Sequence, residues 1–152
     1  MTIRMTLLSL ALATIAACGG GNKGGDTGPG KEASASLYDR LGKKDAITAV
    51  VKDFVEERVA KDARIKSFFA NTDIPDLESK LVDQICEASG GPCKYTGKDM
   101  KTAHTGMAIK DADFNAMVED LKMSLDHFKV GEKEQKDLLG ALGAMHDDIV
   151  GK

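Results

Sequence analysis

Apolar residues recur with a helical repeat in every long segment after the first 36 residues of this chain. In four segments they stand three and four positions apart, which places them on one face of an α-helix rather than on alternating sides of a strand. The four stripes are Ile47, Val50, Val51 and Phe54; Leu77, Leu81 and Ile85; Phe114, Met117, Val118 and Leu121, extended by Leu125 and Phe128; and Leu138, Leu142, Met145 and Ile149. This pattern predicts an all-α domain over residues 37–150, with four substantial helices, a few short ones and no strand.

Polar residues and proline mark where two of these helices begin. Asp45 stands just before the apolar part of the first stripe and is the expected N-cap of that helix. Pro75 precedes the second stripe, and proline is well tolerated in the first turn of a helix. The charged runs 56–58 and 132–134 are interpreted as solvated helix faces.

The first 36 residues do not belong to this domain. Arg4 followed by the apolar run 5–17 is typical of a secretory signal peptide and is too short to cross a bilayer comfortably. The run ends in small residues directly before Cys18, an arrangement that resembles the lipobox of bacterial lipoproteins, in which the cysteine carries lipid; an ordinary secretory signal is the alternative. We therefore expect a signal peptide at 1–17 and a flexible tether rich in glycine and serine at 18–36. The protein is then exported and anchored by lipid on the periplasmic side of a bacterial membrane. The outer membrane is favoured because no acidic residue follows the cysteine.

Charge and cysteine content narrow the partners and the covalent chemistry. The formal net charge of −3 gives no reason to expect a nucleic-acid partner. If Cys18 carries lipid, Cys86 and Cys93 remain as a pair in an oxidising compartment, and we expect them to form a disulfide. Two reduced thiols are the alternative. The chain has no Cys-x-x-Cys-His, so a covalently attached c-type haem is excluded, and it has no Walker loop and no His-Glu-x-x-His.

A long connection containing glycines lies between the second and third stripes and holds His104, one of three histidines. A structureless connection of that length inside a compact domain needs a reason, and wrapping around a bound group supplies one. His104 can be a metal ligand within an aliphatic cage; the alternative is a histidine on an irregular surface loop. His127 and His146 stand beside apolar stripes and are expected at the surface, with Phe128 pointing inward next to His127.

Short motifs along the domain, in their order and spacing, match a known family. They are Leu37-Tyr38-Asp39-Arg40-Leu41-Gly42, Val51-Lys52-Asp53-Phe54, Ser67-Phe68-Phe69, Asn71-Thr72, Gly90-Gly91-Pro92, Tyr95-Thr96-Gly97, and Met100 with His104, Gly106 and Ile109. From about Leu37 to Ile149 the sequence resembles the group I truncated haemoglobins, the two-over-two helical globins. The resemblance implies a helical sandwich around a non-covalent haem b whose iron is held by the imidazole of His104.

The resemblance also assigns side chains to the proximal side and the edge of the haem pocket. Phe69 matches the phenylalanine that packs on the porphyrin of globins. Met100, Ala103, Ile109 and Phe114 are expected to line the proximal and edge surfaces.

The distal side departs from the family pattern. Many group I members place a tyrosine after the residue equivalent to Phe54 and a glutamine on the next long helix, whereas this chain has Val55, Leu77 and Leu81 at those places. Because bound oxygen acquires partial negative charge, fewer hydrogen-bond donors predict weaker oxygen retention. Gln84 is a possible substitute donor one turn further on.

The segment from Phe54 to Val59 is one residue longer than the family pattern. Counting forward from Ile47 places Val55 at the distal position, and counting back from Val59 places Glu56 there. We favour Val55, because burying Glu56 against haem is costly. A π-bulge can absorb the extra residue.

These assignments imply a tethered haem globin that reversibly binds oxygen, nitric oxide or carbon monoxide and is served by an unidentified reductant. A nitric oxide dioxygenase, which converts oxygen and nitric oxide to nitrate, is the alternative, and the apolar distal wall argues against efficient turnover. A haem-free helical lipoprotein that serves as an adaptor is the second alternative.

Overall fold

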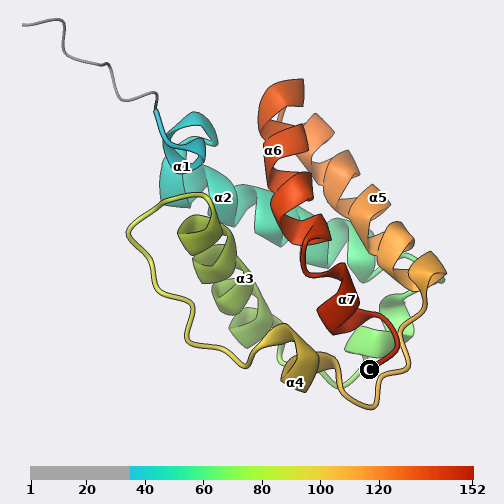
Figure 1. Ribbon diagram of the computed structural model, residues 1–152. Helices are drawn as coiled ribbons and strands as arrows, with labels where there is room; N and C mark the ends of the chain where they lie inside the picture. Colours follow the sequence, from blue (N-terminus) through green and yellow to red (C-terminus); the bar gives the residue numbers. More distant parts are fainter. Residues whose placement is uncertain (1–34) are drawn as a thin grey trace, which may run out of the picture. The chain divides into compact units, whose positions relative to one another are not determined.

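The computed structural model describes residues 35–152, and this part of the chain is helical and contains no β-strand (Figure 1). Its elements are α1 (Leu37–Arg40), α2 (Lys43–Lys52), the π-helical segment η1 (Asp53–Val59), the 3-10 turn η2 (Lys66–Phe69), α3 (Ile74–Ala88), α4 (Met100–His104), α5 (Asp111–His127), α6 (Glu132–Gly143) and α7 (His146–Ile149). The predicted all-α class is confirmed. The four apolar stripes fall on α2 with η1, on α3, on α5, and on α6 continued by α7.

Two pairs of helices build the domain. α2 packs along α3, and α5 packs against α6, to which a short turn joins it (Figure 1). The η1 segment packs against α5 and so connects the two pairs. The short helix α4 contacts α7 at the end of the domain opposite α1.

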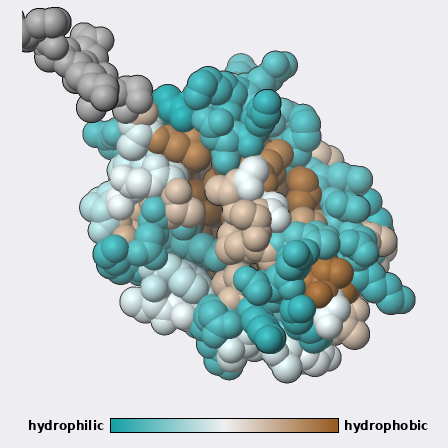
Figure 2. All heavy atoms as spheres, in the orientation of Figure 1, coloured by the Kyte–Doolittle hydropathy of each residue, from teal (hydrophilic) through white to brown (hydrophobic). Residues whose placement is uncertain are grey.

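The apolar stripes of the two pairs meet in one core. Val51 and Leu125 are 1% exposed, and Leu138 is 2% exposed. Full burial of such a side chain contributes roughly 1.5–3 kcal/mol. Figure 2 shows the complementary arrangement at the surface, with hydrophilic residues around the edge of this face and hydrophobic ones nearer its middle.

The inward direction expected for Phe128 is wrong, because its side chain is 41% exposed. The helix α5 ends at His127, and Phe128 is the residue after it, where the chain turns away toward α6. Lys129 has a φ of +56°, which marks this turn. The helical repeat therefore no longer decides which way Phe128 points.

One of the two expected helix starts is confirmed. The Asp73 carboxylate accepts a hydrogen bond from the backbone N–H of Asp76 at 3.0 Å, and Pro75 lies in the first turn of α3. Asp45, however, lies inside the first turn of α2, and the N-cap is Gly42 with a φ of +88°. Glycine adopts this left-handed conformation without the steric cost that a Cβ imposes. Asp45 still suits its place, because a negative charge in the first turn is stabilised by the helix dipole.

The η1 segment accommodates the additional residue anticipated between Phe54 and Val59. The backbone N–H of Ala60 donates to the carbonyl of Val55 at 3.1 Å, five residues back instead of the four of an α-helix. The expected π-bulge is therefore present. It changes the direction in which the side chains after Phe54 point.

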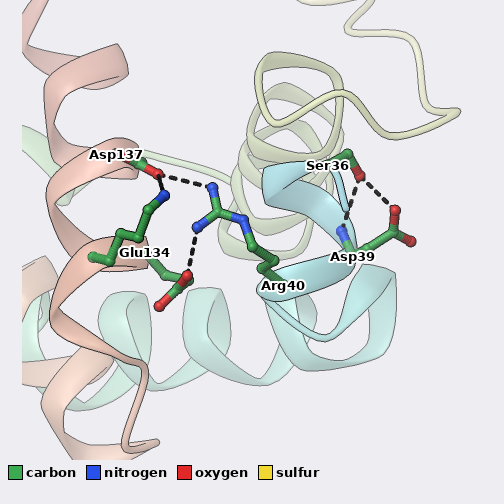
Figure 3. Close-up of polar contacts among 6 residues, drawn as sticks. Ser36, Asp39, Arg40, Glu134 and Asp137 are labelled. Atoms are coloured by element: carbon green, nitrogen blue, oxygen red, sulfur yellow. Dashed lines mark hydrogen bonds and ion pairs between the residues drawn. The ribbon is translucent and has the colours of Figure 1, made fainter. Parts of the chain in front are cut away.

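A polar cluster joins α1 to α6 (Figure 3). The Arg40 guanidinium donates to Glu134 and, at 2.8 Å, to Asp137, while Ser36 caps α1 by accepting a hydrogen bond from the N–H of Asp39. The hydrogen bond from Arg40 lowers the pKa of the Asp137 carboxyl. These contacts hold the first helix of the domain against one of the last.

Cys86 and Cys93 are joined by a disulfide, as expected, with their Cα atoms 5.7 Å apart. Cys86 lies in the last turns of α3 and has no exposed surface, whereas Cys93 belongs to the connection between α3 and α4. The bridge therefore attaches this connection to the core.

The signal peptide at 1–17 and almost all of the tether at 18–36 lie outside the described residues, as does Cys18. Within residues 35–152, no helix combines the length and the apolar composition that crossing a bilayer requires. The first helix of the described part is α1, with Ser36 as its cap. At the other end, backbone hydrogen bonds continue as far as Lys152.

Candidate functional site

Three adjoining cavities meet at His104. The outer cavity has a volume of about 370 Å³ and opens between α3 and α4; the inner cavity lies among α3, α5 and α6; and a third cavity lies beneath the chain that follows α4. His104, Leu81, Gln84 and Met100 line both the outer and the inner cavity. These four side chains form the boundary between the two spaces.

His104 is the last residue of α4, so it stands on a helix and not on the irregular connection that the sequence indicated. The Asp99 carboxylate caps this helix by accepting from the N–H of Thr102 at 2.9 Å. The Nδ1 atom of His104 lies 2.7 Å from the carbonyl oxygen of Met100. A carbonyl oxygen only accepts, so Nδ1 carries a proton, and in the neutral ring the lone pair is then on Nε2. This arrangement fixes the tautomer that a metal-binding histidine needs.

Nine of the ten side chains expected at the site line these cavities. Leu77 and Ala103 line the outer cavity, Phe54 the inner cavity, Ile109 the third cavity, Phe69 the outer and the third, Phe114 the inner and the third, Leu81 and Met100 the outer and the inner, and His104 all three. These residues come from η1, η2, α3, α4, α5 and the chain after α4, so the tertiary fold alone brings them together.

Val55 is the one of the ten expected residues that lies elsewhere, so its distal role stays a prediction. It is 2% exposed, packs in the core and lines none of the three cavities, whereas its neighbour Phe54 faces the inner cavity. Glu56, the alternative, is exposed and pairs with Lys52 at 3.7 Å. The wide π turn rotates the residues after Phe54, so neither way of counting along the chain identifies a distal side chain there.

Apart from Met100, the methionines that line the site were not predicted from the sequence. Met107, Met117 and Met145 line the cavities together with Met100. Met117 and Met145 belong to apolar stripes, but a stripe does not distinguish a residue that lines a cavity from one that is packed in the core. Met107 belongs to no stripe, and no sequence pattern indicated its position. Flexible, polarisable thioethers suit a cavity that must fit an irregular apolar surface.

Gln84 supplies the amide group at the boundary of the outer and inner cavities. Its Nε2 lies 3.4 Å from the sulfur of Met100 and 3.5 Å from the sulfur of Met145. Sulfur is a weak acceptor, so these contacts hold the amide only loosely. Leu77 and Leu81 on the same helix offer no donor.

The mouth of the outer cavity is charged. Lys80 and Lys98 lie there with Asp73, Asp76 and Tyr95. The Asp76 carboxylate raises the pKa of Lys80 through a hydrogen bond, and partial burial raises the pKa of the Tyr95 phenol. The site therefore combines an apolar interior with a rim that carries both signs of charge.

The other two histidines line none of the three cavities, although the His146 ring packs edge-on against Phe114 with its centroid 4.9 Å away. Both ring nitrogens of His146 contact carboxylates, Asp111 at 2.9 Å and Asp147 at 3.0 Å, and these contacts raise the pKa of His146. His127 is exposed beside Phe128. Within residues 35–152 there is no group of three or more histidine, cysteine or acidic side chains that could hold a metal ion.

The chain matches characterised proteins over most of the described residues. The bacterial-like globin family matches residues 36–150. A group 1 truncated hemoglobin of Tetrahymena pyriformis is 34% identical over 116 residues, which cover 69% of this chain and 95% of the relative. A group 1 truncated hemoglobin of Mycolicibacterium paratuberculosis is 34% identical over 119 residues, which cover 78% of this chain and 87% of the relative.

Solved structures agree with the sequence relatives. The Fe(III) truncated hemoglobin of Tetrahymena pyriformis superimposes with a TM-score of 0.74 at 31% identity, covering 78% of this chain and all of that one. The 2/2 hemoglobin of Synechococcus, solved with covalently attached heme, superimposes with a TM-score of 0.71 at 27% identity over the same shares. The expected two-over-two globin fold is confirmed. By its sequence, its fold and the residues around His104, this chain belongs to the bacterial-like globin family.

Proposed function

We propose that this globin holds haem b non-covalently through Nε2 of His104 and reversibly binds diatomic gases such as oxygen, nitric oxide and carbon monoxide. The observation that carries the proposal is the 2.7 Å contact between His104 Nδ1 and the Met100 carbonyl, which occupies Nδ1 and leaves Nε2 as the free ring nitrogen of a side chain that lines all three cavities. Neutral imidazole is the axial ligand of globin haems.

The cavity residues fit such a group. A porphyrin is a broad apolar ring with a polar edge, and the site offers aliphatic, aromatic and thioether side chains inside and two lysines, Lys80 and Lys98, at the mouth. The porphyrin supplies four nitrogen ligands of its own, so His104 can hold haem iron without belonging to a group of three or more histidine, cysteine or acidic side chains, and residues 35–152 contain no such group. When bound, haem iron supplies an open coordination position for a small neutral ligand.

The chain's own residues orient and shield that position. Met100 orients the His104 ring through its carbonyl, while Leu77 and Leu81 exclude water and provide no hydrogen bond. Oxygen acquires partial negative charge on binding, so an apolar wall gives it little extra stabilisation. Reversible gas binding is therefore favoured over nitric oxide dioxygenase activity, which benefits from retained oxygen.

A histidine series tests the axial assignment. We expect His104→Ala to abolish stable haem binding, because within residues 35–152 neither of the other two histidines lines the cavities. His127→Ala and His146→Ala are the matched controls and should bind haem like the wild type. The measurement is titration of each chain with haem b, followed by its Soret band in the ferric, ferrous and carbonmonoxy forms.

Two outcomes of this series contradict the assignment. Equal loss of haem binding in all three variants means that His104 is not the axial ligand. A wild-type chain that shows no Soret band with haem supplied favours the haem-free adaptor instead. A separate rescue experiment uses His104→Gly. If this variant lacks only the imidazole ligand, added imidazole restores the wild-type haem spectrum.

We further propose that the globin is exported and anchored by lipid through Cys18. What supports this is the sequence of residues 1–17 and the small residues before the cysteine. The Cys86–Cys93 disulfide is of a kind that persists in oxidising compartments. The intact mass of the mature protein tests the proposal: a diacylated N-terminal Cys18, lost in Cys18→Ser, supports it, and an uncleaved chain contradicts it.

A further inference from the structure

The helix that carries His104 has little stability of its own. α4 is five residues long, and none of its residues is buried. Isolated helices shorter than about 12–15 residues are marginal in water, since one turn makes few hydrogen bonds for the residues it orders. The capping contact from Asp99 supports only its first turn. The position of α4 therefore depends on the chain on either side of it.

On the C-terminal side, the chain after α4 is tied to the end of the protein. The backbone N–H of Ala108 donates to the carbonyl of Lys152 at 3.2 Å, and that of Gly151 donates to the carbonyl of Ile109 at 2.9 Å. These two bonds hold the segment after His104 beside α7.

On the N-terminal side, residues 89–99 form no helix, and their support comes from the end of α3. Cys93 is bonded to Cys86. Glu87, the next residue of α3, accepts from Lys94 Nζ at 3.0 Å and from the backbone N–H of Tyr95 at 2.9 Å. Three consecutive residues of the connection are thus attached to two consecutive residues of one helix.

The attachment continues from there to α4. The Tyr95 hydroxyl donates to the carbonyl of Lys98 at 2.7 Å, and Asp99 follows as the cap of α4. The path therefore runs without a gap from α3, which carries Leu77 and Leu81, to the helix that carries His104. It joins the two opposite walls of the site.

We propose that the Cys86–Cys93 disulfide positions His104 by fixing α4 relative to α3, so that tight haem retention depends on this bridge. Among the contacts between residues 86–87 and 93–95, the bridge is the covalent one, and its anchor Cys86 has no exposed surface. The Lys94 side chain is 82% exposed, and an ion pair in that setting contributes little by itself. This inference rests on the proposed haem binding and adds to it the element that holds the ligand in place.

The experiment compares haem release from the full chain and from Cys93→Ser, both loaded with ferric haem b. Cys93→Ser opens the bridge and leaves Cys86 as a small apolar side chain in the core. Release is followed as transfer of haem to an excess of a high-affinity apoglobin. We expect release to be about tenfold faster in the variant, the lower end of what losing a partner behind a metal ligand costs. We also expect its iron–histidine Raman band, measured in the ferrous form, to shift or broaden.

The matched control is Arg40→Gln, which removes the ion pairs between α1 and α6 at the opposite end of the domain. Its thermal midpoint is measured beside that of Cys93→Ser, and its haem release should equal that of the wild type. Equal acceleration in both variants means that the bridge acts only through global stability and overturns the inference.

The remaining outcomes are also decisive. Wild-type release and an unchanged Raman band in Cys93→Ser overturn the inference while leaving the proposed function intact. A wild-type chain that binds no haem overturns the proposed function, and this inference with it. If Cys93→Ser does not fold, haem release is measured on the wild-type chain after a phosphine has reduced its bridge, and unchanged release there overturns the inference.

Discussion

The distal wall offers the most direct test of what this globin does with its ligand. Leu81 lies on α3 and lines both the outer and the inner cavity, as His104 does. Glutamine extends one atom further than leucine, so Leu81→Gln brings an amide N–H into a space that the aliphatic side chain now closes. The substitution adds the donor that the wall formed by Leu77 and Leu81 lacks.

The magnitude follows from the hydrogen bond that the amide can make. A net hydrogen bond contributes about 0.5–1.5 kcal/mol. We therefore expect oxygen to dissociate about 2- to 12-fold more slowly from Leu81→Gln than from the wild type. Carbon monoxide acquires less negative charge on binding than oxygen does, so its dissociation should change less.

The assay is stopped-flow displacement of oxygen by carbon monoxide. Leu81→Met is the control, because it keeps the volume and adds no donor, and it should dissociate oxygen at the wild-type rate. Val55→Tyr is the contrasting variant. Because Val55 is packed in the core and lines none of the cavities, a tyrosine there should destabilise the fold by roughly 1–3 kcal/mol and leave oxygen dissociation unchanged.

Two results refute this reasoning. An oxygen dissociation rate that is the same in Leu81→Gln and the wild type means that the wall at Leu81 does not face the ligand. Slower oxygen dissociation in Val55→Tyr, without loss of stability, means that Val55 faces the ligand and that the π turn of η1 does not divert it.

Two further predictions concern a buried carboxyl group and the cap of α4. Asp120 is 1% exposed with one carboxylate oxygen unpartnered, and burial raises its pKa. An acid with a raised folded-state pKa gives stability that is complete below its unfolded pKa of about 3.9 and is lost as pH rises through the folded pKa. Asp120→Asn should thus be more stable than the wild type by about 1 kcal/mol at pH 7, with no advantage below about pH 4, by urea unfolding at both pH values; a less stable variant at pH 7 contradicts this. Asp99→Ala removes the cap of α4, worth about 1 kcal/mol, and should speed haem release with little change in the thermal midpoint, whereas unchanged release shows that the cap does not hold His104.

Local rules account for what could be predicted at the site. His104 stands out because it is the histidine of a connection between apolar stripes, with family motifs on both sides of it. Leu77 and Leu81 are placed correctly because Asp73 and Pro75 begin α3 where the sequence indicates, so the helical repeat runs undisturbed through both leucines. Where the backbone is regular, spacing along the chain translates directly into direction in space.

The misplaced residues lie where the backbone departs from that regularity. Val55 follows the start of a π segment, and Phe128 follows the end of α5. At such places a single changed backbone hydrogen bond alters the direction in which the following side chains point. Packing against other helices then determines which of these side chains is buried. The packing of η1 against α5 is a contact between distant parts of the chain, which periodicity does not report.

The amino-acid sequence was enough to predict the helical class, the four apolar stripes and the resemblance to truncated haemoglobins, and to single out His104 as the candidate axial ligand. Only the packed structure shows that Gln84 and Met145 meet Met100 at the boundary between two cavities, that Val55 lies in the core, and that the Cys86–Cys93 bridge attaches the connection before α4 to α3. The physical reason is the range of the interactions. Helix formation depends on neighbours three and four residues apart, whereas a cavity is lined by side chains from elements that only the packed fold brings together.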